Sequence, residues 1–244
     1  MNKKTSSKDI WQKQWQIFSK NLSYHLNEKV IFQILNLFKQ KLKGIKIIEL
    51  GAGSGGDILY LSQLGAKTTA LDFSQKSISI INSRAKIQKL KIKTICQDCQ
   101  KTKLPNNYFD LVFSVGLVEH FTKPLLTIKE QVRILKPGGY LIIDVPQKFN
   151  LYTLVKKIRM ATKTYPFGWE TEYSVANLKS FGHQLGLKTV DYYGRDSAFT
   201  LKLPKSWQKN YKKLFSHIEN SQLAPYVCLN LGFIYQKPKN YENK

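Results

Sequence analysis

The chain has 244 residues, of which 42% are hydrophobic and 12% aromatic, and its formal net charge is +23. This length suits one large α/β domain, and the hydrophobic content excludes a disordered or low-complexity chain. No apolar run approaches the roughly 18 residues of a membrane-spanning helix, the N-terminal segment lacks the apolar core of a secretory signal, and three cysteines exclude a disulfide scaffold, so we expect a reduced, cytoplasmic protein.

The positive charge comes almost entirely from lysine, because 35 of the 39 basic residues are Lys and only four are Arg. Such a basic chain suggests an anionic partner, either RNA or a membrane surface. Sites that clamp phosphates favour arginine, whose planar group makes paired hydrogen bonds, so lysine-rich codon usage is the competing explanation. Residues 1–48 carry +8 and residues 202–244 carry +6, which concentrates the charge near the two ends.

Two amphipathic helices are predicted in the first 43 residues. Gly44 ends the second of them. Both apolar faces are expected to pack on the rest of the domain, and the first helix is a candidate cover for a substrate pocket. Apolar side chains recur at helical spacing at Ile10, Trp11, Trp15, Phe18 and Leu22, and again at Val30, Ile31, Ile34, Leu35, Phe38 and Leu42.

From Ile45 onward, short apolar runs alternate with helical segments. Strands are predicted at 45–50, 67–71, 92–96, 109–115 and 140–145, and helices at 57–64, 74–90 and 124–135. This alternation is typical of right-handed βαβ units, so it predicts a parallel sheet with helices on both faces.

Residues 147–174 show no regular pattern and are rich in aromatic side chains. Within them, LYTLVKKIRM combines an apolar side with Lys156, Lys157 and Arg159, which fits a solvated helix face or a helix lying on an anionic membrane. After this stretch we predict a helix at 174–186, a strand at 187–193, a basic amphipathic helix at 206–219 and a last strand at 227–235.

The strongest local motif is IIELGAGSGG at residues 47–56, a buried strand that runs through glycines into a helix start. Glycines allow positive φ angles and close approach of a ligand at the positive end of a helix. The spacing matches both G-x-G-x-G and the G-x-G-x-x-G of dinucleotide-binding proteins, so it does not name the ligand. Asp72 ends the second strand, 21 residues after Gly51, where a carboxylate accepts from ribose hydroxyls. Together these features predict an adenosine-containing ligand.

Two later features of the sequence distinguish between the possible adenosine-containing ligands. CQDC places Asp98 just past the third strand, and FDLVFSVGLVEHF is followed by ILKPGGYLIIDVP. With these ordered motifs, residues 44–146 resemble class I S-adenosylmethionine-dependent methyltransferases, in particular the small-molecule type that includes quinone-biosynthesis methyltransferases. The resemblance implies a Rossmann-like, seven-stranded, mostly parallel sheet with one antiparallel strand near the edge. It also implies one domain over 1–244, with a helical arm (1–43), a cofactor-binding core (44–146), an acceptor lid (147–174) and the C-terminal half of the sheet (175–244).

The resemblance further implies that S-adenosylmethionine is the cofactor, and it implies a set of residues that bind it. The implied residues are Glu49, Gly51, Ala52 and Gly53 at the methionine end, Asp72 at the ribose, Phe73, Asp98 and Cys99 at the adenine, and Ser114, Val115 and Gly116 at the sulfonium.

A sulfonium is an activated methyl donor, so the protein must chiefly position the acceptor and exclude water. For a hydroxyl acceptor, a general base adds about 10²–10⁴-fold in rate. Glu119 and His120 follow the fourth strand at the sheet edge where ligands bind in such folds, and they are the predicted catalytic pair. The alternative role of His120 is to order the pocket or to cap a helix.

The segment 147–174 is the predicted acceptor lid, because an aromatic wall with a few polar groups suits a planar or lipid-like acceptor. The alternative is that its aromatic side chains form the core of a small helical cap. The predicted substrate-binding residues are Tyr152, Tyr165, Trp169 and Tyr173.

The favoured function is methyl transfer to oxygen, nitrogen or carbon of a small or lipid-soluble acceptor, in the cytoplasm or at a membrane surface. Cys96 and Cys99 form a lone C-x-x-C without a further ligand cluster, so no metal is predicted. The alternatives are an RNA methyltransferase that uses the basic arm and tail, a cofactor-binding partner module without activity, and a nicotinamide-dependent reductase. The last leaves Asp98 and the LKPGG turn unexplained, and the oligomeric state is not predicted.

Overall fold

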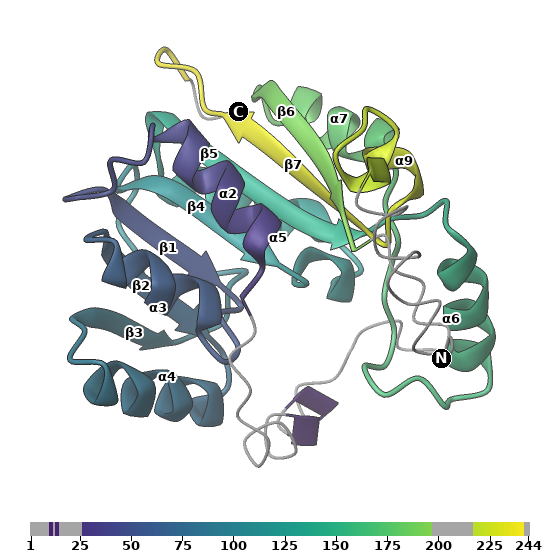
Figure 1. The fold of residues 1–244 in the computed structure, drawn as a ribbon, viewed down its shortest axis with the longest axis horizontal. Helices are drawn as coiled ribbons and strands as arrows, with labels where there is room; N and C mark the ends of the chain where they lie inside the picture. The colour runs from purple at the N-terminus through teal and green to yellow at the C-terminus, as the bar shows by residue number, and fades with distance from the viewer. Residues whose placement is uncertain (1–9, 12, 15–25, 197–216, 242–244) are drawn as a thin grey trace.

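A computed structural model of the protein describes residues 10–11, 13–14, 26–196 and 217–241. Seven strands form one sheet in the order β3-β2-β1-β4-β5-β7-β6 (Figure 1). The strands are β1 (Lys46–Leu50), β2 (Lys67–Asp72), β3 (Ile92–Cys96), β4 (Phe109–Val115), β5 (Leu135–Pro146), β6 (Lys188–Arg195) and β7 (Asn230–Gln236).

The sheet is mostly parallel, as predicted. β1 pairs in parallel with β2 and β4, β2 with β3, and β4 with β5. β7 runs antiparallel to both β5 and β6, so the single reversed strand lies one place in from the edge. The carboxyl ends of the parallel strands therefore meet along one edge of the sheet, where ligands bind in open α/β folds.

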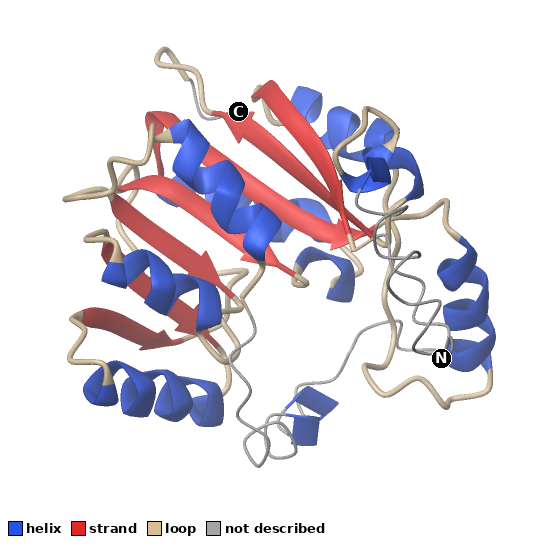
Figure 2. Cartoon of the chain, in the orientation of Figure 1, coloured by secondary structure: helices blue, strands red, loops and turns tan. Residues whose placement is uncertain are grey.

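Helices cover both faces of the sheet (Figure 2). α2, α3 and α4 pack on one face and α5 and α7 on the other, while α6 lies beyond the sheet. The helices are α2 (Glu28–Leu37), α3 (Gly56–Gln63), α4 (Gln75–Ile87), η1 (Val118–His120, a 3-10 turn), α5 (Pro124–Ile134), α6 (Leu151–Ala161), α7 (Val175–Gln184) and α9 (Ala224–Val227).

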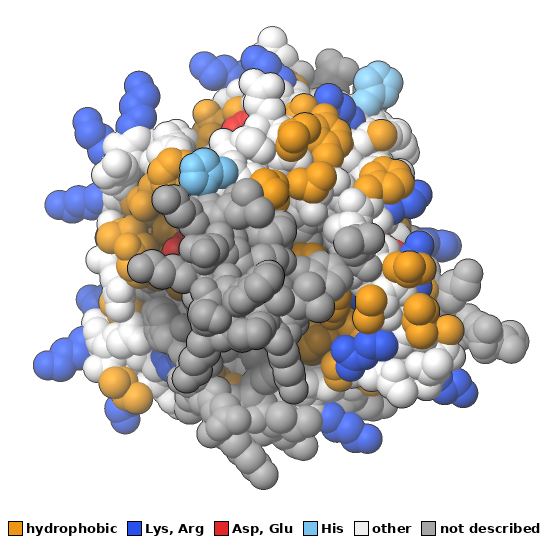
Figure 3. All heavy atoms as spheres, turned by 45° about the vertical axis from the view of Figure 1, so that its right-hand side comes forward, with side chains coloured by type: hydrophobic (Ala, Val, Ile, Leu, Met, Phe, Trp, Pro, Cys, Tyr) orange, Lys and Arg blue, Asp and Glu red, His pale blue; other side chains and the backbone are white. Residues whose placement is uncertain are grey.

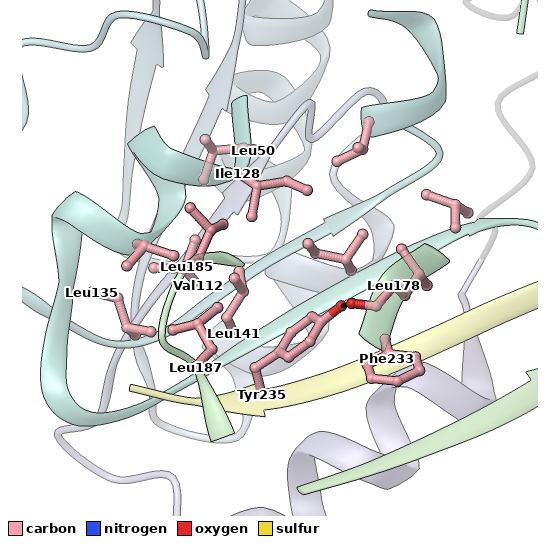
Figure 4. Packing of buried hydrophobic residues seen from close by; sticks show 14 of the residues in the cluster. Leu50, Val112, Ile128, Leu135, Leu141, Leu178, Leu185, Leu187, Phe233 and Tyr235 are labelled. Carbon is pink, nitrogen blue, oxygen red and sulfur yellow. Dashed lines mark hydrogen bonds between the residues drawn. The ribbon is translucent and has the colours of Figure 1, made fainter. Parts of the chain in front are cut away.

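The core consists of two apolar layers separated by the sheet. Successive residues of a strand point to opposite faces, so Ile47 joins the layer under α2 and α3 whereas Ile48 joins the layer under α5 and α7. Figure 4 shows the second layer, in which the Tyr235 hydroxyl donates a hydrogen bond of 2.7 Å to the carbonyl of Leu178. This bond satisfies a polar group that would otherwise cost free energy in an apolar layer.

The structure differs from the sequence prediction in four places. β5 begins at Leu135 rather than at 140, so the LKPGG segment lies within the strand and not in a turn before it. The stretch 147–174, predicted to be irregular, contains α6. The second predicted helix ends at Leu37 rather than near Gly44, because Lys39 and Gln40 adopt positive φ angles. The last strand starts at Asn230, since residues 224–227 form α9.

Parts of two predictions concern residues that the structure does not describe. They are the apolar positions Trp15, Phe18 and Leu22 and most of the predicted basic helix at 206–219, of which only 217–219 are described, as helix. Of the first predicted helix, Ile10, Trp11, Lys13 and Gln14 are described, and all four are helical. Among the described residues, no helix has both the length and the apolarity needed to cross a membrane.

Candidate functional site

A cavity of about 470 Å³ opens at the carboxyl edge of the sheet, beside β1, β2 and β4. It brings together most of the residues that the sequence predicted to bind a cofactor, and it adds several that the sequence did not. The predicted residues that line it are Glu49, Gly51, Ala52, Gly53, Asp72, Phe73, Asp98, Cys99, Val115, Gly116 and His120. The additional lining residues include Trp11, Asn27, Asp57, Gln97, Gln100, Leu117 and Phe121.

The glycine-rich loop between β1 and α3 forms one wall of the cavity. Gly51, Gly53 and Gly55 all have positive φ angles, which side chains rarely adopt. A Cβ atom on Gly51 would lie 2.9 Å from Cδ1 of Leu117. The backbone conformation of Gly51 therefore favours glycine, and the residue lies close to Leu117 in the loop after β4.

Asp72 ties the end of β2 to this loop. Its Oδ2 accepts from the N–H of Gly53 at 2.9 Å, and its Oδ1 accepts from the N–H of Ser74 at 2.8 Å. Burial raises the pKa of Asp72, and these hydrogen bonds oppose that shift because they favour the charged form. An ionised carboxylate has further lone pairs, so Asp72 can order the loop and still accept from a ligand.

Glu49 supplies an unsatisfied acidic group at the other side of the loop. Its carboxyl is buried, and Oε2 has no hydrogen-bond partner among the residues described. Burial, reinforced by the nearby Asp57, raises the pKa of Glu49 well above its usual value. Asp57 itself accepts from the backbone N–H of Asn27 at 2.8 Å and from its side-chain amide at 2.6 Å. A cationic ligand group placed here would relieve the cost of burying the Glu49 charge.

Asp98 and Cys99 line the part of the cavity near β3. The Asp98 carboxylate accepts from the N–H of Gln100 at 2.9 Å, which fixes the loop after the strand. Cys99 is buried and Cys96 is exposed, and neither forms a disulfide among the described residues. Across the part of the chain that the structure describes, no group of three or more His, Cys, Asp and Glu residues is arranged to hold a metal ion.

His120 lies on the cavity wall, within the 3-10 turn η1 that follows β4. Burial lowers the pKa of His120, so the neutral imidazole is favoured near neutral pH even though Glu170 acts in the opposite direction. The Nε2 atom lies 3.9 Å from Oε1 of Glu119 and 4.0 Å from Oε1 of Glu170. A neutral imidazole in a cleft is the form that can accept a proton.

Glu119 lies behind His120 rather than in the cavity wall. Its side chain is buried, and burial together with the charge of Glu170 raises the pKa of Glu119 well above its usual value. The backbone carbonyl of Glu119 accepts from the N–H of Thr171 at 2.9 Å, which joins η1 to the end of the predicted lid.

An aromatic group closes the cavity over His120. The Trp11 ring contacts His120 edge-on with centroids 4.9 Å apart, and it stacks on Phe167 at 5.7 Å. Tyr165 in turn packs against Phe167 at 5.5 Å, and the Gln14 amide donates to the carbonyl of Pro166 at 3.0 Å. Trp11 and Gln14 therefore contact the predicted lid at Pro166 and Phe167, and Trp11 also lines the cavity.

Several predicted residues lie outside the cavity wall. Ser114 is fully buried and donates to Oε1 of Gln131 at 3.3 Å, because alternation along β4 turns its side chain toward α5. Tyr173 packs in the apolar core against Phe181, with ring centroids 5.7 Å apart. Tyr152, Tyr165 and Trp169 are half-buried in the lid and do not line the cavity either.

The residues that the sequence reasoning missed carry weaker local signals. Asn27 precedes α2 and Asp57 lies in the first turn of α3, 30 residues later, so they meet only in the folded chain. Leu117 and Phe121 belong to the same GLVEHF motif as His120, so their place beside it could have been inferred from the motif.

Comparison with known proteins gives a family for this arrangement. Residues 48–143 match the family described as "Methyltransferase domain". A ubiquinone biosynthesis O-methyltransferase of Coxiella burnetii is 30% identical over 150 residues, which cover 60% of this chain and 64% of that protein. The match thus spans less than two thirds of the relative's length.

Solved structures share the fold at low sequence identity. Magnesium protoporphyrin IX methyltransferase from Synechocystis PCC 6803, with bound S-adenosylhomocysteine, superposes with a TM-score of 0.63 at 13% identity, covering 86% of this chain and 80% of that one. A SAM-dependent methyltransferase from Aquifex aeolicus gives a TM-score of 0.55 at 17% identity, covering 82% and 87%.

The cavity fits the cofactor of this family, S-adenosylmethionine. The unpartnered Oε2 of Glu49 suits the α-ammonium of the methionine part. Asp72 retains lone pairs for ribose hydroxyls, and Asp98 lies where an adenine amine could donate. Taken together, the matched residues 48–143, the seven-stranded sheet and this cavity show a methyltransferase domain whose fold is similar to that of S-adenosylmethionine-dependent methyltransferases.

Proposed function

We propose that this protein transfers a methyl group from S-adenosylmethionine to a hydroxyl oxygen of a small, largely apolar acceptor. The observation that carries the proposal is His120, a buried imidazole that is neutral near neutral pH and lies in the wall of the cofactor cavity. Transfer to a hydroxyl needs a base for the hydroxyl proton, whereas many transfers to a neutral amine do not, so this placement favours oxygen over nitrogen.

The residues around His120 support an apolar acceptor. When bound, S-adenosylmethionine supplies an electrophilic methyl group on a positively charged sulfur. Trp11, Leu117 and Phe121 line the cavity beside His120 and would exclude water from the acceptor. His120 would take the hydroxyl proton as the new bond to oxygen forms. Aromatic walls of this kind suit a planar ring, and a hydroxylated aromatic compound is the acceptor class that we propose.

The related Coxiella protein supports the same class, because its name places it in ubiquinone biosynthesis as an O-methyltransferase. Only part of that protein is matched, so the acceptor of this chain remains the object of the experiment below.

The test is an assay of S-adenosylhomocysteine release with hydroxylated aromatic acceptors, comparing the wild type with His120→Gln. We expect kcat to fall by about 10²–10⁴-fold with little change in cofactor affinity, because a general base contributes about that much. His183→Gln is the matched control, since His183 is exposed on α7. Full activity of His120→Gln would refute the role of His120 as general base. Binding of S-adenosylmethionine without turnover of any acceptor would favour the non-catalytic module.

A second proposal concerns where the protein acts, and it rests on α6. Leu154 and Ile158 are 64% and 58% exposed, and Lys157 and Arg159 are exposed on the same helix. Figure 3 brings this side of the molecule forward and shows hydrophobic side chains interspersed with Lys and Arg. Exposed apolar and basic groups together suit an anionic membrane surface, whereas RNA phosphates would require basic groups alone. The membrane would also hold a lipid-soluble acceptor.

Vesicle sedimentation tests this second proposal. The wild type should bind vesicles with phosphatidylglycerol and not those with phosphatidylcholine alone, and Leu154→Ser with Ile158→Ser should weaken that binding. Binding to RNA that falls steeply with salt, with no binding to either vesicle, would favour the RNA methyltransferase instead.

A further inference from the structure

A buried group of charged and polar side chains joins the lid to η1. Lys156 comes from α6, Tyr165, Glu170 and Glu172 come from the segment after it, and Glu119 and His120 belong to η1. The Lys156 side chain is only 3% exposed, and the side chains of Glu170 and Glu172 are each 7% exposed. Burying so many charges is costly unless each has a partner, so their arrangement calls for an explanation.

The two oxygens of Glu170 have different surroundings. Oε2 accepts from Nζ of Lys156 at 3.0 Å and from the hydroxyl of Tyr165, also at 3.0 Å. Oε1 faces η1 and lies 4.0 Å from Nε2 of His120. One oxygen thus anchors the carboxylate in the lid while the other is directed at the imidazole.

Glu119 is equally close to His120 but differs in charge. Its Oε1 lies 3.9 Å from Nε2, yet burial and the charges of Glu170 and Asp144 raise its pKa well above the usual value, and only Lys156 opposes them among the side chains. The neutral form of Glu119 is therefore favoured. Glu170, which is paired with Lys156, is the carboxylate that presents a negative charge to the imidazole.

The remaining charged group, Glu172, provides an internal comparison. Its Oε1 lies 3.0 Å from Nζ of Lys156, the same distance as Glu170. Among the interactions of the described residues, however, Glu172 has no ion pair with His120, whereas Glu170 does. The two glutamates therefore share the structural role in the lid and differ in their relation to His120.

We propose that Glu170 is a positioning residue for His120: its Oε1, 4.0 Å from Nε2, stabilises the imidazolium that forms when His120 takes the acceptor proton. Nδ1 is buried and has no hydrogen-bond partner among the residues described, and Nε2 is the nitrogen that lies near both carboxyl groups. A carboxylate that orients a catalytic histidine and stabilises its charged form is a known arrangement for proton transfer. Here the carboxylate comes from the lid, so lid closure and base activation would be one event.

The proposal rests on the proposed O-methyl transfer, in which the acceptor O–H bond breaks and its proton moves to the imidazole of His120. The new bond joins the acceptor oxygen to the methyl carbon as the bond from that carbon to sulfur breaks, which leaves a neutral thioether. The imidazolium formed carries one positive charge, and Glu170 balances it. The proton is then released to solvent.

The first experiment needs neither cofactor nor acceptor. NMR titration of the histidine side chains gives the pKa of His120 in the wild type, Glu170→Gln and Glu172→Gln. We expect Glu170→Gln to lower that pKa by about one unit, as removal of an opposite charge at this distance does, and Glu172→Gln to leave it close to the wild-type value. Equal shifts in both variants, or none in either, would overturn the proposal. Glu170→Asp, which keeps the charge, should restore much of the shift and serves if Glu170→Gln folds poorly.

The second experiment measures kcat/KM as a function of pH, with a hydroxyl acceptor that the wild type methylates. The acid limb should move to lower pH in Glu170→Gln by the same amount as the NMR shift, and the plateau should fall about 10-fold or more. If Glu170→Gln and Glu172→Gln lose activity alike and the acid limb of the pH profile stays at its wild-type position, Glu170 has only a structural role in the lid and the proposal fails. If no hydroxyl acceptor is methylated by the wild type, the proposed function fails, while the NMR result still decides whether Glu170 controls His120.

Discussion

The cofactor side and the lid side of the cavity are built in different ways. On the cofactor side, the Asp72 carboxylate holds the backbone N–H groups of Gly53 and Ser74, and glycines shape the loop. On the lid side, the contacts run between side chains, with Lys156 bridging Glu170 and Glu172. Backbone groups are fixed once the sheet forms, whereas buried ion pairs depend on every partner being present. The lid should therefore be the part that is easier to break.

The largest effect is expected from Lys156→Met. Removing this ammonium leaves two buried carboxylates without their cation, which costs about 3–5 kcal/mol of stability. Acceptor turnover should be lost with the lid, while the affinity for S-adenosylmethionine should change only slightly because Lys156 does not line the cavity. Denaturant unfolding and titration calorimetry measure the two quantities.

Lys157→Met is the control, since Lys157 is the exposed neighbour on the same helix and surface changes cost little. Loss of cofactor binding in a folded Lys156→Met variant would show that the two sides are not separable.

On the cofactor side, Asp72→Ala should weaken binding of S-adenosylmethionine by about 100-fold, because it removes two charge-assisted hydrogen bonds that order the loop. Calorimetry measures the change. Asp191→Ala removes an exposed carboxylate on β6 and should leave affinity unchanged. Unchanged affinity in Asp72→Ala would overturn its assignment to the cofactor site.

The same contrast explains what the sequence could and could not predict. The glycine loop, Asp72 and Asp98 follow strand ends in fixed motifs, so the parallel topology alone brings them to one edge. Ser114 is the exception, because a motif carried over by position does not say to which face of β4 the side chain points.

The lid offered no such motif. The aromatic residues of 147–174 suggested an acceptor wall, yet Tyr173 belongs to the core and it is Phe167 that stacks on Trp11. Glu170 lies near His120 because the chain after α6 runs back toward η1. Neither the periodicity nor the spacing of residues in the sequence predicts this contact. Long-range pairing of charges is decided by tertiary packing, which a single sequence does not display.

Glu49→Gln tests the unpaired acid on the cofactor side and should weaken cofactor binding by about 10-fold, the value of one hydrogen bond to a charged group. The same variant should be more stable than the wild type in the absence of ligand. Burial raises the pKa of Glu49 in the folded protein. The contribution of Glu49 to the free energy of unfolding is therefore present below its unfolded pKa and is lost as the pH rises through its folded pKa.

The stability advantage of Glu49→Gln over the wild type should therefore grow from about pH 5 toward neutral pH. Over this range the pH rises from near the unfolded pKa of Glu49 toward its raised folded pKa. Unfolding curves across this range provide the measurement. A constant difference would mean that the Glu49 carboxyl does not titrate on folding. Excess S-adenosylmethionine should reverse the order of the two proteins, because only the wild type gains the paired charge.

The smallest effect is expected at Trp11, which touches both sides through His120 and Phe167. Trp11→Phe keeps an aromatic ring, but the smaller ring makes less contact with His120 and Phe167, so the KM for the acceptor should rise about 3-fold, near the lower value of an aromatic pair. Phe32→Leu changes an exposed ring on α2 and is the control. If Trp11→Phe raises the acceptor KM while the Kd for S-adenosylmethionine is unchanged, Trp11 belongs functionally with the lid. A change confined to the cofactor would assign it to the glycine-loop side, and would mean that the lid does not extend to the start of the chain.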